Sequence, residues 1–330
     1  MAEASIDVVG IGNAIVDVLT RSTDGFLEQN ELPKGIMTLI DGDRAEEIYG
    51  LMGPGVEISG GSAANTIAGV AQLGSRAGFI GKVRDDQLGQ VFAHDIRAAG
   101  VQFNTPPADG GPSSGRCLIM VTPDAQRTMT AYLGAAHEIS ADDVDADLVA
   151  AAQVTYLEGY LWDPPGGKAA FRKAMAICEA NDRKVSLTLS DPFCVDRHRD
   201  EFVDLVENQV DILFANEEEI ISLFQVDNFE GAVAAVRQHC EISALTRSEK
   251  GSVIVTNNHV HEIAAEPIAK LVDTTGAGDL YAAGFLHGYA QGLDLALCGQ
   301  FGAIAAAEII GHVGARPEAD LKTLTAHLIP

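Results

Sequence analysis

The second half of the chain alternates short apolar runs with longer helical stretches, and this alternation constrains the fold more than any other feature. The runs predict strands at 154–157, 185–189, 212–215 and 242–246, and the predicted helices cover 166–180, 198–207, 217–224 and 229–240. Strands that alternate with helices of this length are joined by right-handed crossovers into a parallel sheet. The pattern therefore predicts an α/β fold whose mostly parallel central sheet is covered by helices on both faces.

The other segments fit this scheme with two exceptions. Strands are expected at 6–12, 78–83, 115–121, 252–256 and 260–263, and helices at 62–73, 86–99, 278–291 and 294–311. Residues 14–58 and 103–133 instead look extended and contain turns. We interpret them as a small β-sheet that lies over the edge of the parallel sheet as a lid, with surface loops as the simpler alternative. Residues 1–330 then form one domain with inserted lid segments.

Charge and cysteine usage narrow the classes of partner. The 330 residues include 22 Lys and Arg against 47 Asp and Glu, a formal net charge of −25, whereas nucleic acids and anionic membranes require a basic surface. The five cysteines are far apart, which favours reduced thiols in a cytoplasm over disulfides or a zinc site. The sequence shows neither a signal peptide nor a run long enough to span a bilayer. We expect a cytoplasmic protein that binds a small molecule.

The strongest chemical motif is the run Asp273-Thr274-Thr275-Gly276-Ala277-Gly278-Asp279, which opens an apolar helix. Glycines let successive backbone N–H groups converge at a helix N-terminus, where they bind a phosphate or a developing negative charge. Asp279 falls in the first turn and could accept a proton from a hydroxyl that attacks a phosphoryl group. The motif alone is equally consistent with Asp279 as a helix cap.

Two further motifs point to a hydroxyl-bearing ligand. Gly60-Gly61 opens a helix, and Asn65 follows one turn later with an amide that can both donate and accept. Asn13 and Asp17 follow the first strand, where ligands gather in open α/β sheets, and could grip a diol. A tight helix entry with an exposed Asn65 is the alternative for the first of these motifs.

Nucleotide cofactor motifs of two common kinds are missing. Gly10-Ile11-Gly12 resembles the start of a dinucleotide fingerprint, but Ile15 replaces its last glycine and no clean helix follows. The sequence also contains no G-x-x-x-x-G-K-[ST] run. A Rossmann cofactor site and a Walker-type phosphate loop are therefore excluded.

Asn216 and Glu219 sit where a strand becomes a helix, three residues apart on one face. Their oxygens could orient a hydrated Mg²⁺, which prefers oxygen ligands and keeps its waters. An acidic first turn that compensates the helix dipole is the alternative interpretation.

Together these motifs resemble the ribokinase/PfkB family of carbohydrate and nucleoside kinases. Residues 60–74 are similar to its first signature, 273–285 to its second, and Asn216-x-x-Glu219 to its metal-associated motif. They occur in the family's order and cover nearly the whole chain. The resemblance implies a ribokinase-like three-layer α/β/α sandwich with a small β-sheet lid, and use of ATP and Mg²⁺.

Within this family the chain most resembles the adenosine kinases. Asn13-x-x-x-Asp17 is similar to their ribose-gripping pair, residues 210–217 to the run around their metal motif, and residues 187–193 to the segment whose phenylalanine flanks the purine. The implied activity is ATP-dependent phosphorylation of the 5′-hydroxyl of a ribonucleoside, with adenosine as the leading substrate. A sugar kinase of the same family and a non-catalytic nucleoside or sugar sensor stay open as alternatives.

The resemblance also implies roles for single residues. Asp279 matches the catalytic base, and Gly276, Ala277 and Gly278 match the anion hole. The substrate contacts are Asn13, Asp17, Gly61, Asn65, Cys117, Arg127 and Phe193, with Arg127 as a lid arginine and Cys117 and Phe193 in the purine pocket. The ATP contacts are Asn216, Thr246, Ser248, Gly251, Gly276 and Gly278, and Asn216 and Glu219 order the metal through water.

Three further features concern the ATP loop, a monovalent cation and the oligomeric state. Ser248 replaces a glycine that the family usually has in its ATP loop, which leaves the details of that loop open. Asp273, Thr275 and Gly314 resemble the region associated with K⁺. Adenosine kinases of this type are commonly monomers, so we expect a monomer rather than a dimer.

Overall fold

The computed structural model describes residues 4–124 and 126–328. Its main sheet has nine strands in the order β14-β13-β12-β11-β10-β9-β1-β5-β6. The strands are β1 (Ile6–Ile11), β5 (Ala77–Ile80), β6 (Val101–Phe103), β9 (Ala152–Glu158), β10 (Lys184–Thr188), β11 (Ile212–Asn216), β12 (Ile242–Thr246), β13 (Ser252–Thr256) and β14 (Val260–Ile263). Strand β13 pairs antiparallel with β12 and with β14, and the other neighbouring strands pair in parallel. The predicted mostly parallel sheet is therefore confirmed.

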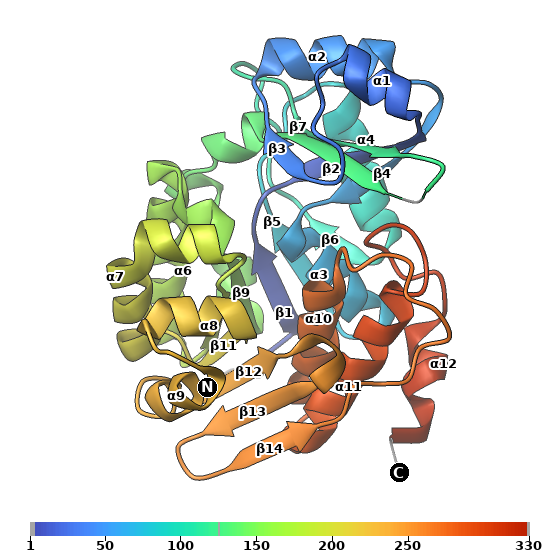
Figure 1. Cartoon of the computed structure of the whole chain (residues 1–330). Helices are drawn as coiled ribbons and strands as arrows, with labels where there is room; N and C mark the ends of the chain where they lie inside the picture. The colour runs from blue at the N-terminus through green and yellow to red at the C-terminus, as the bar shows by residue number, and fades with distance from the viewer. Residues whose placement is uncertain (1–3, 125, 329–330) are drawn as a thin grey trace.

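Alternate residues of the central strands pack into two separate hydrophobic cores, one on each face of the main sheet. Val8 of β1 belongs to one apolar cluster and Val9 to the other, because successive side chains of a strand point to opposite faces. Figure 1 shows α6 (Pro165–Ala180), α7 (Pro192–Asn208) and α8 (Glu217–Phe224) on one side of the sheet, and α3 (Ser62–Gln72), α10 (Ala277–Ala290) and α11 (Leu295–Ile309) on the other. This arrangement is the predicted three-layer α/β/α sandwich.

Four further helices complete the two outer layers or lie at the chain's end. They are α4 (Gln87–Ala98), α5 (Ala146–Ala151), α9 (Phe229–Val236) and α12 (Leu321–Thr325), with short 3₁₀ turns at 134–138, 141–143, 159–162, 248–250 and 326–328. Helix α7 is kinked at His198, whose φ of −126° and ψ of 21° are not helical, so the predicted helix 198–207 corresponds to its second part. The first part begins at Pro192, after a cap from Asp191.

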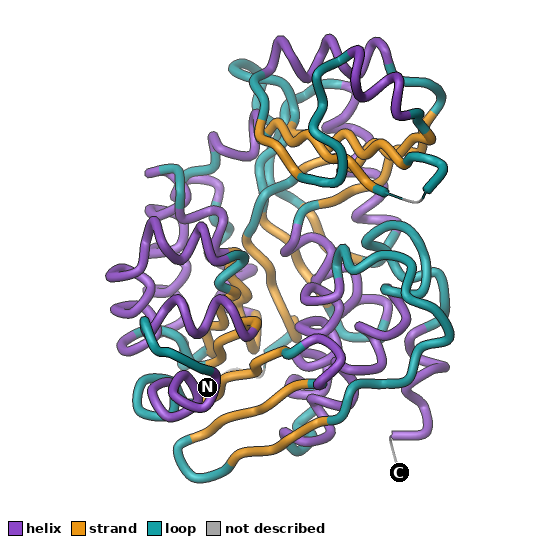
Figure 2. The backbone as a smooth tube through the Cα atoms, in the orientation of Figure 1, coloured by secondary structure: helices purple, strands orange, loops and turns teal. Residues whose placement is uncertain are grey.

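A second, five-stranded sheet has the order β3-β8-β7-β2-β4. It consists of β2 (Ile15–Arg21), β3 (Met37–Leu39), β4 (Gly55–Gly60), β7 (Gly115–Val121) and β8 (Arg127–Tyr132). Figure 2 shows it set apart from the main sheet, at the top of the view. We call it the lid sheet.

The lid segments are not extended throughout. Helices α1 (Asp24–Gln29) and α2 (Gly42–Leu51) lie over the lid sheet, each begun by a side-chain cap from Thr23 or Asp41. They bury apolar residues such as Leu27 and Ile48 together with the inward residues of the lid strands. The expectation that 14–58 is strand-like was therefore wrong for these two stretches.

Among the residues described, no helix is both long and apolar enough to cross a bilayer.

Candidate active site

Asp279 is held at the junction of two helices. It lies in the first turn of α10, and its Oδ1 accepts a hydrogen bond from the Ser62 hydroxyl at 2.7 Å while its Oδ2 accepts one from Asn65 Nδ2 at 3.0 Å. Ser62 and Asn65 both belong to α3. The two strongest sequence motifs, more than two hundred residues apart, therefore meet at one carboxylate.

The surroundings of Asp279 favour proton acceptance. Burial raises the pKa of its carboxyl, and hydrogen bonds from Ser62 and Asn65 together with the charge of Arg316 oppose that rise. A carboxylate with a raised pKa binds a proton more readily than a free one, as a general base must.

The start of α10 has the backbone geometry expected of an anion hole. Gly276 caps the helix in the left-handed region, with φ of 80°, which glycine adopts without strain. A Cβ on Gly278 would meet no heavy atom within 4 Å, so the backbone there borders open space. The backbone N–H of Ala277 already donates to the Thr274 carbonyl at 3.2 Å. The amides of Gly276 and Gly278 lie beside it at a helix N-terminus that a ligand can approach.

Asn13 lies against a carboxylate that the sequence did not single out. Asn13 Nδ2 donates to Glu158 Oε1 at 2.6 Å, and the backbone N–H of Ala63 donates to Glu158 Oε2 at 2.9 Å. Glu158 ends β9, next to β1, and is only 1 % exposed. Its one signal in the sequence is its place at the carboxyl end of a predicted strand, where ligands gather.

Asp17 projects from β2 towards the glycines that open α3. A Cβ on Gly60 would lie 2.5 Å from the Asp17 carboxyl carbon, and one on Gly61 would lie 2.2 Å from the Asn13 carbonyl oxygen. Glycine is required at position 61, where φ is 99° and a backbone oxygen is this close. At position 60 a Cβ would displace the Asp17 carboxyl. Burial raises the pKa of Asp17 to about 6, against the charges of Arg316 and Arg127.

Several buried polar atoms at this centre have no partner among the described residues. They include Oδ1 of Asn13, Oδ1 of Asn65, and Nε and Nη2 of Arg127. A buried polar atom without a partner costs about 1–3 kcal/mol, so these atoms are positions that a ligand would complete. The two amide oxygens can accept from hydroxyl groups, and the guanidinium can donate to a phosphate.

Arg127 connects the lid sheet to the glycine-rich turn. Its Nη1 donates to the Thr275 hydroxyl at 2.8 Å, and its guanidinium forms an ion pair with Asp273. Asp273 also accepts hydrogen bonds from the backbone N–H groups of Thr275 and Gly314. The three residues expected at a K⁺ site do converge, but Arg127 already neutralises Asp273, so this arrangement does not fit a monovalent cation bound to that carboxylate.

Asn216 and Glu219 bind each other. Asn216 Nδ2 donates to Glu219 Oε1 at 2.6 Å, and the Glu219 backbone N–H donates to Asn216 Oδ1 at 2.8 Å. This capping box satisfies the start of α8. In the structure the pair therefore caps the helix, a role different from the dipole compensation that was the alternative interpretation. Among described residues, no group of three or more His, Cys, Asp or Glu could hold a metal ion. Ordering of Mg²⁺ through water by this pair stays a prediction.

The predicted ATP loop follows β12. Thr246 pairs with Asn216 at the ends of their parallel strands. Ser248 adopts φ of 52°, and Gly251 adopts φ of 85° with its Cα so close to the Ile263 carbonyl that a Cβ would lie 2.0 Å from it. Ser248 thus keeps the left-handed backbone that glycine would adopt there.

The two predicted purine-pocket residues lie in different surroundings. Cys117 is buried in the lid sheet, in register with Asp17 on one side and Ala131 on the other. Phe193 is the second residue of α7, and its side chain is 74 % exposed. The structure does not enclose Phe193 in a pocket, and its contact with a purine stays a prediction.

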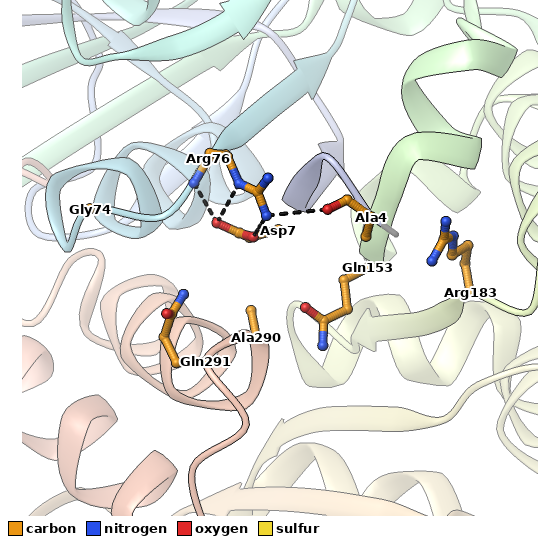
Figure 3. A pocket seen from close by; sticks show the side chains of 8 residues that line it. All are labelled: Ala4, Asp7, Gly74, Arg76, Gln153, Arg183, Ala290 and Gln291. Atoms are coloured by element: carbon orange, nitrogen blue, oxygen red, sulfur yellow. Dashed lines mark hydrogen bonds and ion pairs between the residues drawn. The ribbon is translucent and has the colours of Figure 1, made fainter. Parts of the chain in front are cut away.

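A polar cavity at the opposite end of the sheet does not belong to this site. The cavity has a volume of about 620 Å³. Figure 3 shows the side chains that line it, among them Asp7 and Gln153 near the amino ends of β1 and β9. Asn13, Glu158 and Asn216 lie at or beyond the carboxyl ends of their strands. Ligands of open α/β sheets bind at the carboxyl ends, so the chemistry is placed there.

Comparison with known proteins supports the fold and the family. The chain is 51% identical to adenosine kinase from Sinorhizobium meliloti, over 98% of this chain and 99% of that one, with a TM-score of 0.91. It is 49% identical to a probable sugar kinase from Rhizobium etli, over 99% of this chain and 100% of that one, also with a TM-score of 0.91.

A curated relative is an uncharacterized sugar kinase from Archaeoglobus fulgidus, 30% identical over 75% of this chain and 96% of that protein. The pattern described as pfkB family carbohydrate kinase matches residues 41–322. With this match and the convergence of its two signature motifs on Asp279, the chain belongs to the pfkB family of carbohydrate kinases.

Proposed function

We propose that this kinase transfers the γ-phosphoryl group of ATP to the 5′-hydroxyl of a ribonucleoside, with adenosine as its preferred acceptor. The observation that carries the proposal is the cradle around Asp279: a base fixed by Ser62 and Asn65, next to the free amide oxygens of Asn13 and Asn65. The 51% identity to an adenosine kinase supports the choice of acceptor.

In this mechanism Asp279 takes the proton of the 5′-hydroxyl as its oxygen attacks the γ-phosphorus. The new O–P bond forms while the bond to the β-phosphate oxygen breaks, and ADP leaves. The amides of Gly276, Ala277 and Gly278 stabilise charge on the transferred group, where loss of one such donor costs about 3–4 kcal/mol. The free nitrogens of Arg127 are suited to bind the same group.

Further parts of the proposal concern ATP and the lid. Asn216, Thr246, Ser248 and Gly251 hold ATP at the carboxyl ends of β11 and β12. Mg²⁺, when bound to ATP, neutralises charge on its phosphates. The lid sheet brings Asp17, Cys117 and Arg127 over the acceptor and excludes water, which would otherwise compete with it.

Sugar phosphorylation is the second candidate. Glu158 places a buried carboxylate beside Asn13, and such a group is a strong acceptor for sugar hydroxyls. One relative with 49% identity is a probable sugar kinase. Both candidates use Asp279 in the same way and differ in what fills the space under the lid.

The test is ADP release with a panel of purine and pyrimidine nucleosides, ribose and fructose. We expect the highest kcat/KM with adenosine. Equal kcat/KM for ribose and adenosine would support the sugar kinase, and ADP formation with none of the acceptors would support a binding protein instead.

A further inference from the structure

Arg316 lies between α11 and α12 and was not singled out in the sequence. Its Nη1 donates to the Ala64 carbonyl at 2.8 Å, and its Nη2 donates to the Ser59 carbonyl at 2.7 Å and the Ser59 hydroxyl at 2.8 Å. Ser59 lies in lid strand β4, and Ala64 lies in the first turn of α3. The guanidinium of Arg316 therefore joins the segment after α11 to both the lid sheet and helix α3.

On the lid side, the contact of Arg316 lies next to Asp17. Gly60 follows Ser59, and a Cβ built on Gly60 would lie 2.5–2.6 Å from the carboxyl atoms of Asp17. Asp95 of α4 also holds Ser59, because its Oδ2 accepts hydrogen bonds from both the backbone N–H and the hydroxyl of Ser59. Arg316 therefore contacts the edge strand β4, which pairs with β2, the strand that carries Asp17.

On the helix side, the contact of Arg316 lies next to Asp279. Asn65 follows Ala64 and donates to Asp279 Oδ2. The guanidinium and the candidate base are therefore held by adjacent residues of one helical turn. The carboxylates of Asp17 and Asp279 both interact electrostatically with Arg316.

Arg316 keeps its charge although it is enclosed. Burial lowers its pKa to about 10, against the charges of Asp95, Asp17 and Asp279, so the guanidinium is protonated at neutral pH. The other groups that face Asp279 are the acidic Asp17 and Glu158, the phenol Tyr156, and the uncharged Ser62 and Asn65.

Building on the proposed role of Asp279 as base, we propose that Arg316 is a positioning residue of the phosphotransfer site. Its charge compensates the buried carboxylates of Asp17 and Asp279, and its hydrogen bonds hold lid strand β4 against helix α3. It acts through these residues and needs no contact with either substrate.

The test is the pH dependence of kcat/KM for the acceptor, measured in an Asp17→Asn background so that Asp17 does not titrate. Arg316→Gln removes the positive charge, which makes Asp279 easier to protonate. The acid limb of the profile is expected to move up by about one pH unit or more. Arg316→Lys keeps the charge and loses the forked hydrogen bonds, so its limb is expected to stay near that of the Asp17→Asn parent while KM rises.

Two outcomes would overturn the role of Arg316. The first is an acid limb of the kcat/KM profile that does not move in folded Arg316→Gln. The second is an acid limb that moves equally in Arg316→Gln and Arg316→Lys. If Arg316→Gln does not fold, the Lys variant decides, and a displaced limb there contradicts the proposal. Arg97→Gln is the matched control, because Arg97 donates from Nε and Nη2 to the Phe103 carbonyl away from this site. Its limb is expected to coincide with that of the parent.

Asp279→Asn separates the two proposals. Retained turnover in that variant overturns the base role and the role of Arg316 with it. Lost turnover in Asp279→Asn, combined with an unmoved limb in Arg316→Gln, overturns only the role of Arg316.

Discussion

Asn65 donates a hydrogen bond from its Nδ2 to Asp279 Oδ2 at 3.0 Å, and its own Oδ1 is buried with no partner among the described residues. One amide therefore orients the candidate base and offers an acceptor to the substrate hydroxyl. This double use explains why an amide, rather than a carboxylate, suits position 65.

Asn65→Asp is expected to lower activity at neutral pH at least tenfold. A second carboxylate at this distance raises the pKa of Asp279, so the acid limb of the kcat/KM profile moves to higher pH. Ser62→Ala is the control, because it removes the other hydrogen bond to Asp279 without adding charge. A limb that moves equally in both variants would argue against like-charge repulsion.

Gly60→Ala is expected to raise KM for the acceptor about tenfold with little change in ATP affinity. The added methyl group would lie 2.5 Å from the Asp17 carboxyl carbon and displace that side chain, at a cost of about 1–3 kcal/mol. Gly50→Ala in α2 is the matched control, because its Cβ would meet nothing within 4 Å. Unchanged KM in Gly60→Ala would remove Asp17 from the acceptor site.

Glu158→Gln is expected to change the pH dependence of stability. Burial raises the pKa of Glu158 from 4.5 to about 7, so the folded state favours the protonated form. The stability this group contributes is present below pH 4.5 and is lost as pH rises through about 7. Relative to wild type, the variant should gain about 2–3 kcal/mol in unfolding free energy between pH 5 and pH 8, measured by denaturant titration. The same difference between the two proteins at both pH values would contradict this.

Phe193→Ala is expected to raise KM for adenosine much more than KM for ribose. Stacking of a base on an aromatic ring is worth about 1–3 kcal/mol, and the exposed ring of Phe193 is free to stack. Leu324→Ala is the comparison at another exposed apolar residue. A similar rise for both acceptors would show that Phe193 does not contact the base.

Much of the main sheet could be predicted because most of its strands carry runs of apolar residues. The short strand β6, with the sequence Val-Gln-Phe, was not predicted. The bounds of β12, β13, β14 and α8 agree with expectation. The lid helices α1 and α2 were missed because they are short and their apolar residues are few. Thr23 and Asp41, which cap them, were the available signals.

Only those site residues that belong to a sequence motif could be predicted. Asp279 and Asn65 belong to local patterns with a chemical meaning, so their meeting could be anticipated. Glu158 and Arg316 belong to no motif, and their importance depends on contacts with residues up to 257 positions away. For Asn216 and Glu219 the sequence pattern is ambiguous, because the same pattern is typical of metal binding and of a helix cap.

The most direct test of the account is the product formed from ATP and adenosine by the wild type and by Asp279→Asn, with AMP and ADP quantified in parallel. We predict equal amounts of AMP and ADP from the wild type. We also predict turnover lowered by about 10²–10⁴ in the variant, with ATP binding nearly intact. Near-native AMP production by Asp279→Asn, or ADP without AMP from the wild type, would contradict the account.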